Sequence, residues 1–568
     1  MKYKLINENI KSKNLLDIVY ENRGVTRNQV NELLKADNRY YRNPFEIFNM
    51  DKAVEMFNES YFKNLIIGLI IDTDVDGYTS STLLYQWLVN KVKHPKENIR
   101  VIHHTRAKAH GLSDDIFENV LYSNVNLWLI ADSSTNDKEQ LKQMSSLGQR
   151  IIILDHHDCE EYEEIEDVVI VNNQLGDLSN KCLSGVGVAY KFIEALGYDA
   201  SEYMDLVAIG QVADNMNMID LQNRGYTNEG LKNVNNELIK EFFKDYKNPI
   251  IENISWGCAN YMNSVIRYGT MEEKEILWKA MNGEEGTISY KNKKGDIVEQ
   301  SLQEGLVRIS NNVKARQNNA IKKSVKAIEK HIYKYELEKD KCIIIENDNL
   351  VEPGLGGITA QKLSTSFKRP VIIVSPFQGD MSGSLRSQVD LRDVISESGL
   401  VTFATGHQRA CGIGLPKENV SKLKEYLNEY LKDFDVDETI EEVDYIFNGK
   451  DVKMENVKEV ADLNELWCKD IQKPTFIVKN VELESHKITY KREGICYVAS
   501  FTWNGIMFKK KFCSREVYEN MMRKDLLKFG RSHLISLSLL CEFSKEENGF
   551  YYISIKDFNS VKSSKINF

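Results

Sequence analysis

Acidic and imidazole side chains follow three apolar runs of the chain, each at the point where a buried strand would end. The runs cover residues 65–70, 127–131 and 151–154. The groups that follow them, with one acidic residue farther along, are Asp72, Asp74, Asp76, Asp132, Asp155, His156, His157 and Asp214. Open α/β sheets build their sites at the carboxyl ends of strands, so we expect these groups to converge. So much negative charge in one place requires cations.

The predicted cluster suits hard divalent cations. Carboxylate oxygens are the ligands that Mg²⁺ prefers, and imidazole draws the choice toward Mn²⁺. The Asp-x-Asp-x-Asp alternation would aim its carboxylates at one point, Asp132 could bridge two ions, and His156 with Asp214 would complete the second ion's shell. Two ions about 3.5–4 Å apart would activate a water for in-line displacement at phosphorus, leaving His157 free to touch the substrate. These residues predict a metal-dependent hydrolase.

Each cluster alone has a simpler explanation. Aspartates after strands commonly cap helix N-termini, and two adjacent histidines are a weak signal. Three clusters at consecutive strand ends, followed by Ala213-Asp214-Asn215, favour a metal site over separate caps.

The composition narrows the class of protein. The 568 residues suffice for roughly three to four domains. The net charge of -10 argues against a surface coated with basic patches but leaves a local nucleic-acid groove open. The start of the chain has no apolar signal region, and no stretch has the length of a membrane span. Nine cysteines without a C-x-x-C pair indicate reduced thiols, so a cytoplasmic location is expected.

Periodicity predicts an α/β first half. Residues 1–60 read as a helical N-terminal lead-in, and residues 61–225 alternate strands with amphipathic helices. The predicted strands are residues 64–71, 100–104, 126–131, 150–154 and 167–171, whose continuous apolar runs are typical of a parallel sheet covered on both faces. A helix is predicted over 205–212. Residues 226–340 are predicted to be a helical connector that ends in one long helix over 301–336. The lysines of this helix are better explained as a solvent-exposed face than as a nucleic-acid contact.

The second half predicts two further domains. Residues 341–430 form a smaller α/β unit beginning with the apolar run at 342–345. After an acidic stretch, residues 440–568 turn to short strands at 475–478, 494–503, 507–512, 534–543 and 550–555, which indicate a small barrel or sandwich.

Glycine turns mark further candidate sites. Gly185-x-Gly187 lacks the third glycine of a dinucleotide fingerprint, so close helix packing or a phosphate at a helix N-terminus explains it better. In the smaller α/β unit, two glycine loops carry Ser384 with Arg386, and His407. Glycines let backbone amides approach an anion that Arg or His can pair with. Singly such loops are usually turns, but together they favour a substrate cradle.

These motifs resemble those of DHH phosphoesterases. Asp72-x-Asp74-x-Asp76-Gly77, Asp132, Asp155-His156-His157 and Val212-Ala213-Asp214 are similar to the four motifs of that family. The segments 356–360, 383–387 and 406–412 resemble its associated C-terminal domain. The order and spacing over about residues 60–415 resemble RecJ-type single-strand-specific exonucleases in particular.

The resemblance implies a parallel-sheet DHH lobe and a smaller DHH-associated lobe joined by a long helix, plus a β-rich, OB-like C-terminal domain. It implies a 5′→3′ exonuclease that threads single-stranded DNA between the lobes and releases 5′-mononucleotides with two Mn²⁺ or Mg²⁺ ions. The implied metal ligands are Asp74, Asp76, Asp132, His156 and Asp214, with Asp72 supporting the site and His157 near the scissile phosphate. The implied phosphate contacts are Ser384, Arg386 and His407. Arg106 and His110 also lie where related enzymes place phosphate-contacting residues, but that match is less specific.

The chain also departs from the family pattern. The usual Asp-Cys-Gly or Asp-x-Gly of the second motif is Asp132-Ser133-Ser134, which alters the loop but keeps the ligand. In the C-terminal domain, Phe501, Trp503, Phe508 and Phe512 flank three lysines and could stack on DNA, although half of them must be core if the strands alternate.

Two rival readings stay open. A phosphoesterase of short oligonucleotides, cyclic dinucleotides or pyrophosphate would use the same centre, but it would not need the extra C-terminal domain. A catalytically silent replication or repair scaffold would not need the intact ligands. For the nuclease, single-stranded DNA is the expected partner, a single-strand-binding protein or a helicase is a candidate partner, and no membrane is expected.

Overall fold

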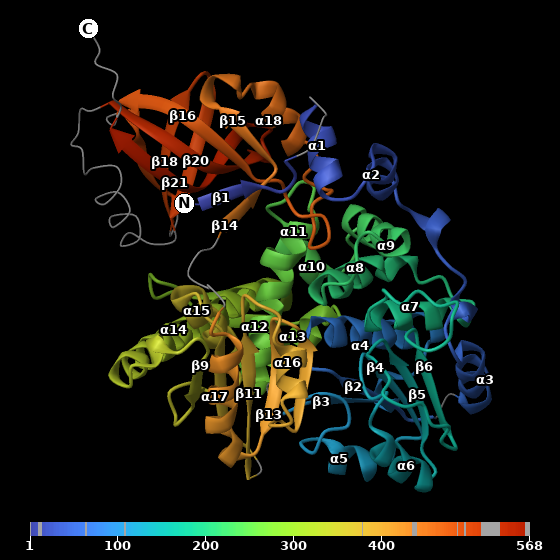
Figure 1. Ribbon diagram of the computed structural model, residues 1–568. Coiled ribbons are helices and arrows are strands. Elements are labelled where there is room, and N and C mark those ends of the chain that lie inside the picture. Colours follow the sequence, from blue (N-terminus) through green and yellow to red (C-terminus); the bar gives the residue numbers. More distant parts are fainter. Residues whose placement is uncertain are drawn as a thin grey trace.

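The computed structural model describes residues 2–8, 14–62, 65–106, 109–377, 379–433, 440–484, 487–493, 496–512 and 534–562 (Figure 1). The predicted strand start at Asn64, the strand start at Gly494 and part of the acidic stretch lie outside these residues. No helix in the described ranges is both long and apolar enough to cross a bilayer.

The first lobe is built on a five-stranded parallel sheet. Its strands are β2 (Ile67–Ile71), β3 (Ile99–His103), β4 (Leu127–Ala131), β5 (Arg150–Asp155) and β6 (Val168–Asn172), in the order β3-β2-β4-β5-β6. Every predicted strand of this lobe is present. Helices α3 (Met50–Ser60), α4 (Val75–Trp87) and α7 (Gly185–Ala195) cover one face, and α5 (Phe117–Leu121) and α6 (Lys138–Ser146) cover the other. Burial on both faces explains the continuous apolar runs.

A helical region follows the sheet. It comprises α8 (Met204–Ala213), α9 (Leu221–Lys232), α10 (Glu237–Phe243), α11 (Ile251–Asn253), α12 (Asn260–Tyr268), α13 (Met271–Met281) and the long α14 (Leu302–Lys334). Ser301 and Glu304 form a capping box that begins α14.

The helical region also contains a hairpin where only helix was expected. Strands β7 (Thr287–Lys291) and β8 (Ile297–Ser301) pair around a turn in which Gly295 has a φ of +95°. One face of the hairpin lies on α14, where the Arg308 guanidinium stacks 4.1 Å from the centre of the Tyr290 ring. The turn glycine and the alternating Ile288 and Tyr290 were the sequence signals for it.

The second lobe carries a mixed five-stranded sheet. Its order is β12 (Phe403–His407), β13 (Ala410–Leu415), β11 (Asp380–Arg386), β10 (Val371–Phe377) and β9 (Ile343–Glu346), and only β9 and β10 are parallel. Helices α16 (Arg392–Glu397) and α17 (Val420–Tyr430) cover one face. Helix α15 (Gly356–Phe367) and the end of α14 cover the other, so the long helix joins the two lobes as expected.

The C-terminal domain is β-rich, as expected. A seven-stranded sheet runs β15 (Tyr445–Asn448), β16 (Phe476–Glu484), β20 (Leu534–Lys545), β21 (Tyr551–Lys562), β19 (Ile506–Phe512), β18 (Cys496–Trp503) and β17 (Thr489–Glu493). Helix α18 (Met454–Ala461) packs on β20 and β21. The apolar core of this domain buries Phe501, Phe508 and Phe512. Trp503 is half-buried, and its indole N–H donates to the Glu482 carbonyl. Three of the four candidate stacking aromatics are therefore core.

The N-terminal segment belongs spatially to this C-terminal domain. Strand β1 (Lys2–Leu5) pairs in parallel with β14 (Ile440–Val443), and α1 (Leu15–Asn22) and α2 (Arg27–Leu34) share the apolar core of the seven-stranded sheet. The Arg23 guanidinium donates to both carboxylate oxygens of Asp444 at 2.6 and 2.9 Å. Because Asp444 is fully buried, this pair fixes the segment firmly.

Candidate metal centre

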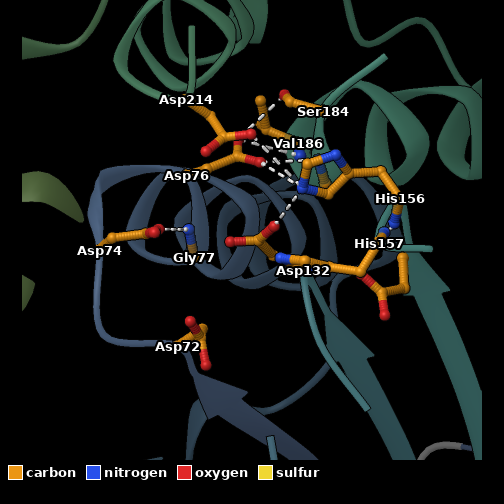
Figure 2. Close-up of polar contacts among 12 residues, drawn as sticks. Asp72, Asp74, Asp76, Gly77, Asp132, His156, His157, Ser184, Val186 and Asp214 are labelled. Atoms are coloured by element: carbon orange, nitrogen blue, oxygen red, sulfur yellow. Dashed lines mark hydrogen bonds and ion pairs between the residues drawn. The ribbon is translucent and has the colours of Figure 1, made fainter. Parts of the chain in front are cut away.

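The predicted acidic and imidazole side chains meet at the carboxyl edge of the first-lobe sheet. Figure 2 shows the His156 ring facing the carboxylates of Asp76, Asp132 and Asp214, with Asp72 and Asp74 on the other side of Asp132. The His156 Nε2 atom lies 3.1 Å from Asp132, 3.6 Å from Asp214 and 3.9 Å from Asp76.

The ligand atoms form overlapping groups. Asp76, His156 and Asp214 each place one atom within 4.8 Å of the others, and so do Asp72, Asp74 and Asp132. Asp132 also groups with both histidines, so its carboxylate lies between the two sets. The bridging role expected of Asp132 therefore stays a prediction that this position favours, and Asp72 lies within one of the candidate ligand groups.

The loop between β2 and α4 positions the first three carboxylates. Asp74 caps α4 by accepting from the Gly77 N–H at 3.1 Å, so the capping explanation also holds for this residue. Asp72 accepts from the Gly111 N–H at 3.2 Å. Asp76, on the first turn of α4, is nearly fully buried.

The glycine turn before α7 holds Asp76. Its carboxylate accepts from the Gly185 N–H at 2.6 Å, the Val186 N–H at 3.2 Å and the Ser184 hydroxyl at 3.0 Å. The anion at this helix N-terminus is thus a protein carboxylate, not the substrate phosphate considered from sequence. The expected close packing is also present, because a Cβ on Gly185 would lie 2.6 Å from Asp132 Oδ1.

Asp155 orients the two histidines, a role that the sequence did not assign. Its buried carboxylate accepts from the backbone N–H of His156 at 2.7 Å and pairs with His157 Nδ1 at 2.8 Å. Backbone N–H of Thr135 donates to the other oxygen. Although burial favours its neutral form, these contacts lower the pKa of Asp155. The carboxylate therefore stays ionised, fixing the backbone at His156 and the ring of His157.

Burial and repulsion dominate the electrostatics of the centre. Burial raises the pKa of Asp76 and Asp132, and the neighbouring carboxylates raise it further. The same causes raise the pKa of Asp214 to about 8. Burial lowers the pKa of His156 to about 4, so its ring is neutral and keeps a nitrogen lone pair for a metal.

The residues fit a pair of hard divalent cations. Asp132 Oδ1 is buried and completes no hydrogen bond within the described chain, despite the nearby His156 ring. Crowded carboxylates with raised pKa values, an unsatisfied buried oxygen and a neutral imidazole are the donor set for Mn²⁺ or Mg²⁺. Cations at this point would remove the repulsion that raises those pKa values.

His110 contacts a candidate ligand, whereas the described ion pairs of Arg106 are to other carboxylates. His110 Nδ1 is 3.1 Å from Asp72, and its ring meets that of His157 edge-on at 4.7 Å. Burial opposes the charged form, but the bond and charge of Asp72 raise the pKa of His110 to about 9. The Arg106 guanidinium lies 3.8 and 3.9 Å from Asp114 and Asp115, and its predicted phosphate contact stays a prediction.

Arg267 of α12 is a cation at the site that sequence reasoning missed. Its guanidinium lies 3.6 Å from the Asp74 carboxylate, and its Nε–H donates to the Thr73 carbonyl at 3.4 Å. The next residue, Tyr268, donates its hydroxyl to Glu352 near the second lobe at 2.8 Å. No motif marks Arg267, because it lies on a helix far along the chain.

The second lobe places its three candidate phosphate contacts together. Arg386 on β11 and His407 on β12 are both paired with Ala410 on the strand between them, β13. The side chains of Arg386 and His407 therefore lie on the same face of the sheet. Gly357, at the N-terminus of α15, lies against Arg386 and the Ser384 hydroxyl, and a Cβ there would be 2.8 Å from the Arg386 Nη2 atom. The half-buried Arg386 guanidinium has no carboxylate partner among the described ion pairs. Such a cation beside a helix N-terminus suits an anion.

Comparisons with known proteins agree with this architecture. Residues 66–211 match the N-terminal domain of the DHH family. A putative SPbeta prophage-derived single-strand DNA-specific exonuclease YorK of Bacillus subtilis (strain 168) is 29% identical over 546 residues, 92% of each chain. The single-stranded-DNA-specific exonuclease RecJ of the same organism is 27% identical over 78% of this chain and 56% of its own length.

The fold of the whole chain has a counterpart among solved structures. The crystal structure of RecJ in complex with Mn²⁺ from Thermus thermophilus superposes with a TM-score of 0.68, covering 97% of this chain and 76% of that one at 18% identity. The matching domain, the full-length relative and this superposition lead to one conclusion: the chain carries a DHH domain over residues 66–211 and is similar over most of its length to RecJ-type exonucleases.

Proposed function

We propose that this protein is a Mn²⁺- or Mg²⁺-dependent exonuclease that degrades single-stranded DNA in the 5′→3′ direction by a two-metal mechanism. The observation that carries the proposal is the shared position of Asp132 between two groups of ligand atoms. A pair of cations at such a centre supplies charge neutralisation and polarises the scissile phosphate and the attacking water.

The residues of the chain prepare the centre for hydrolysis. Asp155 fixes the backbone of His156 and the ring of His157, and the N-terminus of α7 fixes Asp76. His157 and the protonated His110 lie side by side at the exposed edge, where they can donate to oxygens of the scissile phosphate. A water oxygen forms a bond to phosphorus while the P–O3′ bond breaks. The leaving nucleotide keeps its 5′-phosphate and gains a 3′-hydroxyl, and the shortened strand begins with a new 5′-phosphate.

The second lobe supports an exonuclease over an endonuclease. Arg386, Ser384 and His407 gather on one face beside the N-terminus of α15, which is a suitable site for the terminal phosphate of a strand. Holding a terminal phosphate at a fixed distance from the metal centre would limit cleavage to the terminal nucleotide. The names of the relatives favour single-stranded DNA as the substrate. Cytoplasm is the expected compartment, and a single-strand-binding protein or a helicase would act on the same strand.

End-labelled oligonucleotides test the proposal directly. With Mn²⁺ or Mg²⁺, a 5′-labelled single strand should release labelled mononucleotide at once, whereas a 3′-labelled strand should shorten progressively. Blunt-ended duplexes should not be degraded, and single strands should not be degraded when a chelator is present. Release of mononucleotide from the 3′ end would refute the polarity, and activity confined to substrates of two to four nucleotides would favour the short-substrate phosphoesterase instead.

A further inference from the structure

The C-terminal domain reaches the metal centre through one turn. This docking turn, residues 465–471, follows α18, and Figure 1 shows the C-terminal domain above the helices α8 and α9. The Cys468 N–H donates to the Ile471 carbonyl at 3.0 Å, and Lys469 and Asp470 lie between these two residues. Leu466 and Ile471 on either side are fully buried in the apolar core of the domain.

Hydrogen bonds hold the docking turn against the first lobe. Arg224 of α9, which is almost fully buried, donates to the carbonyls of Glu465 at 3.2 Å and Leu466 at 2.7 Å. The Met218 N–H donates to the Asp470 carboxylate at 2.8 Å. Met218 lies four residues after the metal-ligand candidate Asp214, in the segment that leaves α8. The turn is therefore fixed beside that ligand, and Lys469 is fixed with it.

Lys469 is an exposed cation at this position. Among the described ion pairs none includes Lys469, whereas Asp470 next to it is occupied by the Met218 N–H. The contact between Asp470 and the Met218 N–H places the backbone of Lys469 beside the segment that follows Asp214. An exposed ammonium on a turn held beside a phosphodiesterase centre suits one ligand class, the phosphates of the substrate.

We propose that Lys469 is a substrate-binding residue, supplied by the C-terminal domain, that contacts the phosphate on the 3′ side of the scissile one. This inference rests on the proposed function. The second lobe approaches the centre at Asp74 through α12, while the docking turn approaches it at Asp214. If the terminal 5′-nucleotide occupies the second-lobe face with Arg386, the uncut strand leaves past the docking turn. The C-terminal domain is then part of the active site as well as a separate lobe.

Steady-state kinetics on two substrates test the inference. For a single strand of about twenty nucleotides, Lys469→Ala should raise KM about fivefold, change kcat less than about twofold, and lower the slope of log KM against log salt by about 0.7. Lys469→Glu should raise KM more, and Lys469→Arg should restore it. On a 5′-phosphorylated dinucleotide, which lacks the next phosphate, Lys469→Ala should match the wild type.

The control is Lys450→Ala, which removes an exposed lysine elsewhere in the same domain. It should leave both substrates unaffected, and thermal unfolding should be unchanged in all four variants. If wild type degrades the long strand but Lys469→Ala behaves like Lys450→Ala, or is impaired equally on the dinucleotide, the inference is overturned. If the wild type degrades no single strand at all, the proposed function itself fails.

Discussion

Asp132 lies between the two ligand groups, so its removal weakens both at once. We expect Asp132→Asn to lower the rate of single-strand degradation about a thousandfold or more, because both ions of a two-metal clamp lose a ligand. Since burial raises the pKa of Asp132, the neutral amide should cost the metal-free protein no stability. Nuclease assays and thermal unfolding in a chelator measure the two effects.

Asp158 provides the matched control for that variant. It follows the two histidines, but its side chain is exposed and lies in neither ligand group. Asp158→Asn should keep near wild-type activity. Undiminished hydrolysis by Asp132→Asn would show that the ligand assignment is incorrect.

Ser134 adopts a backbone conformation suited to glycine. Its φ is +77°, and the family's second motif usually has glycine at this position. A left-handed conformation costs a residue with a Cβ about 1 kcal/mol or more. Ser134→Gly should therefore raise the free energy of unfolding by about 0.5–1 kcal/mol, read by denaturant titration. The neighbouring Ser133→Gly, where φ is not positive, should lower it instead.

The convergence of the candidate ligands was predictable from sequence, whereas the residues that support them were harder to predict. Asp74, Asp76, Asp132, His156 and Asp214 each stand at a strand or helix end, where residue type and position carry the signal. Arg267 contacts the site from a helix without any motif, so only the tertiary packing shows it. Arg106 illustrates the opposite case, since a basic residue in the right loop faces Asp114 and Asp115.

At the scale of elements, the start of α7 connects the ligands to the sheet. A Cβ on Gly185 would lie 2.5–2.7 Å from Asp132 atoms, so Gly185→Ala must displace either the helix or the ligand. We expect at least a hundredfold loss of nuclease activity and a loss of about 2–3 kcal/mol in stability, measured by assay and urea unfolding. Gly257→Ala is the control, because the nearest atom to its Cβ would be 3.9 Å away. Equal behaviour of the two variants would contradict this packing role.

Elements with strong periodicity were predictable, and short paired strands were not. The five strands of the first sheet and the long helix α14 stand out because burial on both faces, or one apolar stripe over many turns, repeats the signal. The hairpin of β7 and β8 is short and half exposed, so its alternation is weak. Strand β1 pairs with β14 from the far end of the sequence, and no local pattern specifies such a partner.

At the scale of the whole molecule, the metal centre makes stability depend on pH. Burial raises the folded-state pKa of Asp76, Asp132 and Asp214 above the value of about 4 for an unfolded carboxyl group. Above pH 4 the metal-free folded protein therefore binds more protons than the unfolded chain. The contribution of these groups to the free energy of unfolding therefore falls as the pH rises to about 8.

Cations offset this loss, since they bind the ionised carboxylates of the folded state. The rise in Tm on adding saturating Mn²⁺ should be larger at about pH 8 than at about pH 5. Scanning calorimetry with and without Mn²⁺ at both pH values measures the difference. An equal or smaller rise at the higher pH would contradict the assigned pKa directions.

The ion pair between Arg23 and Asp444 joins the N-terminal segment to the C-terminal domain. Only 10% of the Arg23 side chain and none of the Asp444 side chain is exposed. Arg23→Met should lower the stability by about 3–5 kcal/mol, because it leaves a buried carboxylate without its cation. Arg27→Met, which breaks the exposed pair with Asp17, should cost at most about 1 kcal/mol. Similar urea midpoints for both variants would show that the buried pair is not critical.

The pairing of β1 with β14 has a consequence for biosynthesis. Residues 2–5 leave the ribosome well before residues 440–443, the strand that completes their hydrogen bonds. The parallel sheet and helices of the first lobe can form from residues already made, while the leading strand and the Arg23 guanidinium wait for their partners. A nascent chain released before that point would expose an unpaired strand edge, which invites aggregation or capture by a chaperone.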